Sequence, residues 1–567
     1  MLTDIDTTAH AVLRGWSGLA LDFAAVQAPM WTAMARGRAE WRAFAASPVI
    51  AGTLMVATGI GMSLASPLLH SMHVAAGGLM EYALGAGLGG LLGYGGGRVL
   101  AAPPRRVEDH IRGTTIFDAD EASAQRSPWR GAGRARDAST GSRQTRITLA
   151  GIPVPAADET KHFKLMGTTG AGKSTAIAEL LSGALRRGDR AIVADPDGGY
   201  LARFFDPRRG DVTLSPFEAG GAKWDLFGEI REEYDIDQLA LALIPDHEGQ
   251  DRSWRGYART LFSAVTSQAR TGGVSDVNTL FELLVVSRKS ELELLVAGTP
   301  AQAFFEEHND RMLDSIRSVL TSAVGALQHV ARQESQPLSV RQWVQSGRGV
   351  LFIPYRAGQI AALRSTISAW MRIGIFEVMS RPADDQRLWF VVDELDALGQ
   401  IDGLKDALAR LRKFGGRCVL GFQSVAQVSS TYGKEAQTIV ENCGNSLVLR
   451  CSASEHGGTS QFASRLIGQR EVVRISRSKS RRPGDLLPSI TESEHRQVEP
   501  AVLDSEIERL PDLAGFLKLA SSPDWLRVSL RPPQPVHAAP IRPQPPREAV
   551  RVRDSGVFLD AWEHDGR

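Results

Sequence analysis

Cysteine is scarce in this sequence of 567 residues, which contains only Cys418, Cys443 and Cys451. No two of them form a C-x-x-C pair, which argues against a disulfide framework and against a zinc site of the common spacing. A large net charge is also missing, because 65 Lys and Arg residues balance 64 Asp and Glu residues. Contacts with nucleic acid must therefore come from local basic patches rather than from a uniformly basic surface.

Charged residues are missing from the stretch Ser47 to Leu69, which is long enough to cross a bilayer core. A second apolar run, Leu79 to Leu100, carries charged residues only near its ends. These runs predict a transmembrane hairpin over residues 47–102 that follows a cytoplasmic segment over residues 1–46. The positive-inside rule places both flanks in the cytoplasm, since arginines precede the first run and follow the second. The alternative is a buried helical hairpin in a soluble protein.

Glycine recurs at every fourth residue of the second apolar run. The residues are Gly85, Gly89, Gly93 and Gly97. Small residues at this spacing let two helix backbones approach closely in lipid. The pattern predicts a helix contact, either within the hairpin or between subunits.

Residues 167–174 match the phosphate-loop signature G-x-x-x-x-G-K-[ST] in full. The apolar stretch FKLM precedes them and a run with helical spacing follows, so the loop joins a strand to a helix. Its glycines allow backbone N–H groups to gather around one anion at the positive end of that helix. Lys173 is predicted to reach the β and γ phosphates of ATP, and Ser174 to hold Mg²⁺. The alternative is an ordinary glycine turn. The predicted nucleotide-binding residues are Gly167, Thr168, Thr169, Gly170, Ala171, Gly172, Lys173, Ser174 and Thr175.

A second motif, VVDELD, ends the apolar strand Trp389 to Val392. Strands that alternate with helices form a parallel sheet, which brings such strand ends to one edge. Asp393 is predicted as a metal-site residue that holds the water shell of Mg²⁺, and Glu394 is predicted to polarise the attacking water. Alone, this motif is also explained as a chance strand end. Together with the phosphate loop, it predicts an NTP-hydrolysing site.

A third strand, Cys418 to Phe422, ends at Gln423. This glutamine is predicted to sense the γ-phosphate, and the alternative is a polar residue that only closes a strand. A basic cluster precedes the strand, and one of its members is expected either to act as an arginine finger on a neighbouring subunit or to be an ordinary surface residue. The cluster consists of Arg410, Arg412, Lys413 and Arg417.

Two other segments are rich in basic residues and serine. Residues 103–150 show little periodicity and predict a basic linker, which either faces lipid or nucleic acid or is merely solvated. Residues 471–482, EVVRISRSKSRR, predict a basic loop that either tracks a phosphate backbone or is solvated.

The remaining patterns predict the domain organisation. The nucleotide-binding domain covers residues 151–231 and 337–530, where strand and helix signals alternate. Between these parts, residues 232–336 carry helical patterns and few strand signals, which predicts an inserted all-helical domain. Residues 531–567 are rich in proline and predict a disordered tail.

The ordered set of motifs resembles the conjugative coupling proteins of type IV secretion systems, the TraD/TrwB type of the FtsK/HerA-like superfamily. The resemblance covers the chain from about Arg105 to about Leu530 and rests on GTTGAGKST, ADPDGGYLARFF, KWDLFGEI, FIPYRAGQIAALRSTISAWM, LWFVVDELDAL and GGRCVLGFQSVAQVSSTYG. It implies an α/β fold in which a RecA-like P-loop NTPase domain carries an inserted all-α domain. It also implies a two-helix transmembrane anchor in the bacterial inner membrane.

The same resemblance implies a function. Members of this family are homohexameric, DNA-stimulated ATPases that link the relaxosome and its relaxase to the secretion channel proteins and move single-stranded DNA. The tail after Leu530 has no match in this pattern. By position, the family's roles in nucleotide binding, metal binding, water activation, γ-phosphate sensing and action across the subunit interface fall on Lys173, Ser174, Asp393, Glu394, Gln423 and Arg412.

Two other functions compete with a single-strand DNA motor. One is a membrane-anchored pump for duplex DNA of the chromosome-segregation type, which usually carries more spans, a long linker and a winged-helix domain. The other is a membrane receptor that docks the relaxosome or protein substrates and uses ATP only to change shape. Hydrolysis stimulated by DNA would favour a motor, whereas hydrolysis indifferent to DNA would favour the receptor.

Overall fold

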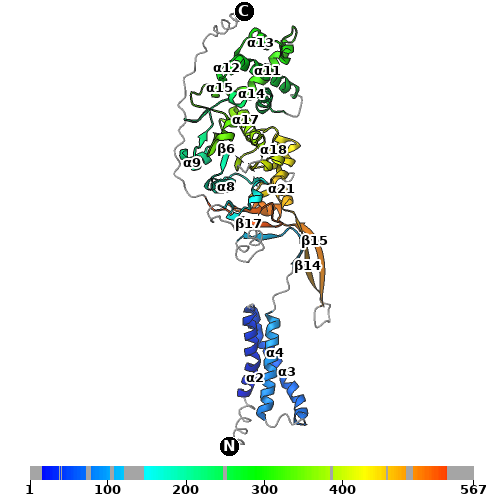
Figure 1. Ribbon diagram of the computed structural model, residues 1–567. Coiled ribbons are helices and arrows are strands. Elements are labelled where there is room, and N and C mark those ends of the chain that lie inside the picture. Colours follow the sequence, from blue (N-terminus) through cyan, green and yellow to red (C-terminus); the bar gives the residue numbers. More distant parts are fainter. Residues whose placement is uncertain are drawn as a thin grey trace, which may run out of the picture. The chain divides into compact units, whose positions relative to one another are not determined.

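The structure is a computed structural model (Figure 1). It divides into two compact units, one formed by residues 1–111 and 471–497 and the other by residues 112–470 and 498–567. Most of the predicted basic linker and almost all of the predicted proline-rich tail lie outside the described residues. The described residues are 16–37, 39, 41–71, 78–101, 108–119, 146–246, 252–382, 387–454, 458–480 and 489–532.

The first unit contains three helices that pack on one another, α2 (Trp16–Arg36), α3 (Trp41–Ser71) and α4 (Gly78–Leu100). Among the described helices, one is long and apolar enough to cross a membrane, and its apolar window is Ala43–Ala65 in α3. The helix α4, which carries Glu81 and Arg98, does not meet this condition of length and apolar composition. The prediction of two spans is therefore supported for the first run only.

The helix α2 lies within residues 1–46, for which the sequence predicts only a cytoplasmic segment. It lies against the glycine face of α4. A methyl group added at Gly93 would overlap the carbonyl oxygen of Val26, and one added at Gly97 would overlap that of Met30. Gly93 and Gly97 therefore allow the backbones of α4 and α2 to approach closely within one chain.

A three-stranded sheet is formed by β1 (Glu108–Gly113), β14 (Gln469–Ser480) and β15 (Ser489–Pro500), in that order. The prediction of a basic loop over residues 471–482 is wrong as far as Ser480, because these residues form a strand. The β-branched residues of the stretch EVVRIS favour an extended backbone. The rest of the predicted loop lies outside the described residues.

The second unit is built on a ten-stranded sheet. From β13 to β7 all neighbouring strands are parallel, whereas β16 runs antiparallel to β13 and to β17. In spatial order the strands are β2 (Ile116–Asp118), β17 (Trp525–Ser529), β16 (Ala514–Lys518), β13 (Asn445–Val448), β5 (Phe163–Met166), β12 (Gly416–Phe422), β11 (Leu388–Val392), β6 (Arg190–Pro196), β10 (Val350–Tyr355) and β7 (Val212–Thr213).

The central strands are buried on both faces, and alternate side chains enter two separate cores. In β11, Leu388, Phe390 and Val392 belong to one core, while Trp389 and Val391 belong to the other. The first core includes α17 (Ile360–Met379) and α18 (Leu404–Leu411), and the second includes α8 (Lys173–Arg187). The result is a three-layer α/β arrangement with helices on both faces of the sheet.

Shorter elements connect these layers. They are β3 (Thr148–Leu149), β4 (Ile152–Pro153), α7 (Ala156–Glu159), α9 (Gly199–Phe204), η2 (Pro207–Arg209), η3 (Phe227–Glu229), α16 (Val340–Ser346), η6 (Arg412–Phe414), α19 (Val425–Tyr432), α20 (Glu435–Asn442), α21 (Gly458–Ile467) and α22 (Asp504–Glu508).

A group of helices gathers at one end of the second unit (Figure 1). The chain enters this group after β8 (Lys223–Trp224) and returns at β9 (Pro337–Leu338), and these two short strands pair in parallel. The helices are α10 (Glu233–Leu243), α11 (Arg252–Thr271), α12 (Val277–Phe281), η4 (Glu282–Val286), α13 (Lys289–Leu295), η5 (Pro300–Phe305), α14 (Asp310–Val324) and α15 (Leu327–Ala331).

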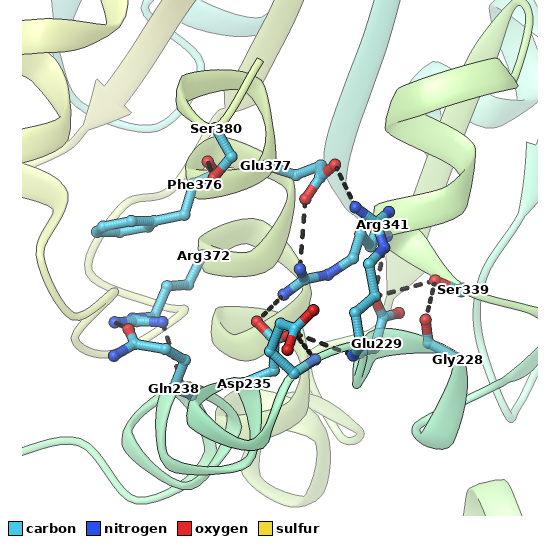
Figure 2. Close-up of polar contacts among 12 residues, drawn as sticks. Gly228, Glu229, Asp235, Gln238, Ser339, Arg341, Arg372, Phe376, Glu377 and Ser380 are labelled. Atoms are coloured by element: carbon cyan, nitrogen blue, oxygen red, sulfur yellow. Dashed lines mark hydrogen bonds and ion pairs between the residues drawn. The ribbon is translucent and has the colours of Figure 1, made fainter.

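The chain crosses between the sheet and the helical group twice, in an outgoing crossing after β8 and a returning crossing after β9. A buried polar network joins these two crossings (Figure 2). Glu229 lies on the outgoing crossing and is 2% exposed. Its carboxylate accepts hydrogen bonds from the returning crossing, from the backbone N–H of Val340 at 2.6 Å and from that of Arg341 at 3.0 Å. The Arg341 guanidinium forms an ion pair with Asp235 of α10 at 2.8 Å. The helical group is therefore anchored where it leaves the sheet.

Candidate nucleotide-binding site

The phosphate loop lies between β5 and α8, at the carboxyl edge of the parallel sheet. Gly170 and Gly172 have φ values of 79° and 116°, which other residues rarely adopt. Ala171 N–H donates to the carbonyl oxygen of Thr168 at 3.2 Å, which closes a turn inside the loop. Lys173 begins α8, and Ser174 and Thr175 follow in its first turn.

Lys173 folds back over its own loop. Its Nζ donates to the carbonyl oxygens of Gly167 at 2.6 Å and Thr168 at 3.3 Å. Burial lowers the pKa of Lys173, and the negative charge of Asp393 opposes this shift. The amino group is thus a buried donor held next to the loop, where an anionic phosphate would stabilise its charge.

Asp393 follows β11, and the strand order brings it to the phosphate loop. Its Oδ2 accepts a hydrogen bond from the Ser174 hydroxyl at 2.6 Å and another from the Tyr200 hydroxyl at 2.8 Å. Its Oδ1 is buried and has no hydrogen-bond partner among the residues that the structure describes. A carboxylate oxygen left free beside a serine hydroxyl fits the oxygen ligands that Mg²⁺ prefers. The residues present therefore fit a magnesium ion.

Gln423 links Glu394 to the phosphate loop. Strand β12 lies between β5 and β11, so its carboxyl end falls between the two motifs. The Gln423 amide donates from Nε2 to Glu394 Oε1 at 2.8 Å. Its Oε1 accepts a hydrogen bond from the Thr169 hydroxyl at 3.1 Å. The structure therefore brings together the predicted residues of the loop, Asp393, Glu394 and Gln423.

Arg412 does not join this group. It is exposed in η6, just before β12 begins, and so lies at the amino edge of the sheet, opposite the loop of its own chain. Arg417 of the same predicted cluster is buried and pairs with Glu159 at 3.0 Å, which excludes it as a surface finger. Arg412 is therefore distant from the phosphate loop of its own chain, where the phosphates are expected to bind.

Two tyrosines and one aspartate near Asp393 have no role assigned from the sequence, although Asp195 is recognisable there as a residue that ends a strand. Tyr200 donates to Asp393, and Tyr355 at the end of β10 has a buried hydroxyl with no partner in the described part of the chain. Asp195, near the end of β6, is fully buried, and burial raises its pKa to about 7. A strand-end aspartate was a usable signal, whereas nothing in the motif ADPDGGY indicates which residue its tyrosine meets.

Comparison with known proteins gives the family. Residues 146–531 match the family model described as the type IV secretion-system coupling protein DNA-binding domain. The coupling protein TraD of Escherichia coli K12 is 30% identical over 430 residues, which cover 74% of this chain and 59% of TraD. A conjugal transfer protein TraG of Escherichia coli is 25% identical over 336 residues, covering 52% of each chain. The chain thus spans little more than half the length of these curated relatives.

Solved structures agree with this result. The unbound conjugative coupling protein TrwBdeltaN70 is 30% identical with a TM-score of 0.66, and the match covers 76% of this chain and 96% of that one. TrwB in complex with ADP and Mg²⁺ is 30% identical with a TM-score of 0.64, covering 75% and 95%. These matches confirm the RecA-like α/β core that the sequence predicted. The chain belongs to the family of type IV secretion-system coupling proteins.

Proposed function

We propose that this chain is the ATP-hydrolysing motor of a conjugative type IV secretion system, where it links the relaxosome to the secretion channel and moves single-stranded DNA. The observation that carries the proposal is the meeting of the phosphate loop with the carboxyl ends of β11 and β12. Phosphoryl transfer to water needs a phosphate cradle, a metal-binding carboxylate and a water-orienting group in one place.

Each residue has a defined task in this proposal. When ATP binds, the Lys173 amino group donates to the β and γ phosphates instead of to the carbonyl oxygens of its own loop. Ser174 and Asp393 hold Mg²⁺, which when bound offsets the charge on the phosphates. Glu394 orients the attacking water and accepts its proton. Gln423 donates a hydrogen bond to Glu394 and so links the position of that carboxylate to the conformation of the phosphate loop.

ATP and Mg²⁺ are proposed as the natural substrate and ion. TrwB, a solved relative, has been determined with ADP and Mg²⁺ and with non-hydrolysable analogues of both ATP and GTP. In this chain, the free Asp393 oxygen beside Ser174 supports a bound divalent ion.

A homohexamer in the bacterial inner membrane completes the proposal. Arg412 is exposed on the sheet edge opposite its own phosphate loop, so it is available to a neighbouring copy's nucleotide.

The helices α3 and α4 are proposed as the two spans of the anchor, since both are apolar over most of their length. The helical insertion over 232–336 is proposed to face the relaxosome.

The test is ATP hydrolysis by the full-length protein in detergent micelles, without DNA, with single-stranded DNA and with duplex DNA. The motor predicts that single-stranded DNA stimulates hydrolysis several-fold more than duplex DNA does. A preference for duplex DNA would favour the chromosome-segregation type of pump instead.

The matched variants are Lys173→Ala and Lys405→Ala. Lys405 lies on the surface in an ion pair with Glu435 at 2.8 Å, a kind of contact that contributes little. Hydrolysis is expected to disappear only in Lys173→Ala. If neither DNA changes the rate of hydrolysis by the wild-type protein, the motor function is wrong and the receptor function is favoured.

A further inference from the structure

Tyr200 connects the end of β6 to the metal-binding carboxylate. The helix α9 follows β6 after only Asp197 and Gly198, and Asp195 holds its first turn in place. Asp195 accepts hydrogen bonds from the backbone N–H of Tyr200 at 3.1 Å and from that of Leu201 at 2.6 Å. The Tyr200 side chain is 5% exposed and directs its hydroxyl to Asp393 Oδ2 at 2.8 Å. Tyr200 is therefore fixed at its backbone by one aspartate and at its hydroxyl by another.

The two carboxylate oxygens of Asp393 therefore differ in the hydrogen bonds that they accept. Oδ2 receives the hydroxyls of Ser174 and Tyr200, whereas Oδ1 is buried without a partner among the described residues. The last torsion of an aspartate side chain has a broad, two-fold profile, so its own energetics do not fix the direction of either oxygen. Two donors on one oxygen fix this torsion and leave Oδ1 as the oxygen without a donor.

We propose that Tyr200 is a positioning residue that holds the Asp393 carboxylate with Oδ1 free for the metal ion, and that it thereby sets the affinity of the nucleotide site for Mg²⁺. This inference rests on the proposed function of the same site. Groups that hydrogen-bond a metal ligand commonly change metal affinity by about 10- to 100-fold when removed.

The phenol of Tyr200 contributes one hydrogen bond to Asp393, from its hydroxyl to Oδ2. Its ring packs in the core on the α8 face of the sheet, so phenylalanine would keep this packing and remove only the hydrogen bond.

The test compares ADP binding to the full-length protein in detergent micelles, with saturating Mg²⁺ and with a chelator, by isothermal titration calorimetry. In Tyr200→Phe, we expect ADP affinity with chelator to equal that of the wild type. The Mg²⁺ concentration for half-maximal enhancement of ADP binding is expected to rise about tenfold. A second readout is the binding of Mn²⁺ to the ADP-loaded protein, measured by electron paramagnetic resonance, which should weaken by a similar factor.

The matched control is Tyr432→Phe. Tyr432 is 3% exposed, and its hydroxyl contacts the backbone of Gly399 and Ile401 rather than Asp393. Its removal should leave the Mg²⁺ dependence unchanged, even where it lowers thermal stability. The inference is wrong if Tyr200→Phe shows the wild-type Mg²⁺ dependence, or if both variants shift it equally. If the wild-type protein binds no ADP under either condition, the proposed function fails and the inference falls with it.

Discussion

Ser174 and Asp393 lie 219 residues apart in the chain, yet the serine hydroxyl donates to the aspartate Oδ2 at 2.6 Å. The contact arises because β5 and β11 end at the same edge of the sheet with only β12 between them. The same order inserts Gln423 between the loop and Glu394. The sheet thus assembles one site from three distant segments.

Arg412 should act on the site of a neighbouring copy. Arg412→Ala alone is expected to slow ATP hydrolysis by about a thousandfold, as is typical when an arginine finger is lost. A mixture of Arg412→Ala and Lys173→Ala proteins should regain activity, because some interfaces then pair an intact Lys173 with an intact Arg412. Lys413→Ala, at the exposed neighbouring position, serves as the control. Mixed proteins as inactive as each variant alone would contradict action between subunits.

Glu229 should be essential for stability, although it lies away from the phosphate loop in the chain. Its carboxylate also accepts a hydrogen bond from Trp224 Nε1 at 3.0 Å and one from the Ser339 hydroxyl at 3.0 Å. Glu229→Ala leaves several buried donors unpaired, so the free energy of unfolding should fall by at least about 3 kcal/mol. Glu233→Ala, at an exposed position of α10, should change it by less than about 0.5 kcal/mol. Chemical denaturation of both variants measures this, and equal losses would refute the role of the network.

Gly93 should be needed for the packing of α2 on α4. Alanine at this position would push against the Val26 carbonyl and should cost about 1–3 kcal/mol, as overpacking commonly does. Gly95 offers a matched control in the same helix, since a methyl group there would meet nothing within 4 Å. Hydrogen exchange of α2 peptides in detergent micelles should accelerate in Gly93→Ala and not in Gly95→Ala. Unchanged exchange in both variants would show that the contact is absent.

His162 should make the protein sensitive to mild acid. Its Nδ1 accepts a hydrogen bond from Cys418 N–H at 3.1 Å, and its Nε2 donates to the Leu408 carbonyl at 3.0 Å, so the neutral ring fits. Burial lowers its pKa to about 4, and the positive charges of Arg417 and Arg412 act in the same direction.

Because the folded-state pKa lies below that of the unfolded chain, the contribution of His162 to stability is complete above about pH 6.5. It falls by about 3 kcal/mol as the pH drops towards 4. His162→Gln keeps a donor and an acceptor but does not titrate, so its unfolding free energy should lose less over this interval. Identical pH profiles of the two proteins would rule out this role.

The sequence predicted the parts of the site that are encoded locally. The loop at Gly167 to Ser174 and the strand end at Asp393 carry their own signals, because a parallel sheet places such strand ends at one edge. Tyr200 gave no such signal, since its partner is 193 residues further along the chain. The same limit applies to α2, whose packing depends on glycines of α4, and to β14, where β-branched residues outweigh the basic charge.

ATP turnover by Glu394→Gln shows whether this site hydrolyses ATP in the way proposed. Wild-type and variant full-length proteins are compared in detergent micelles, with and without single-stranded DNA, for ATP binding and for hydrolysis. Single-stranded DNA should stimulate the wild type, whereas Glu394→Gln should bind ATP normally but hydrolyse it at least about a hundredfold more slowly under both conditions. Hydrolysis by Glu394→Gln at the wild-type rate would show that Glu394 does not activate the attacking water.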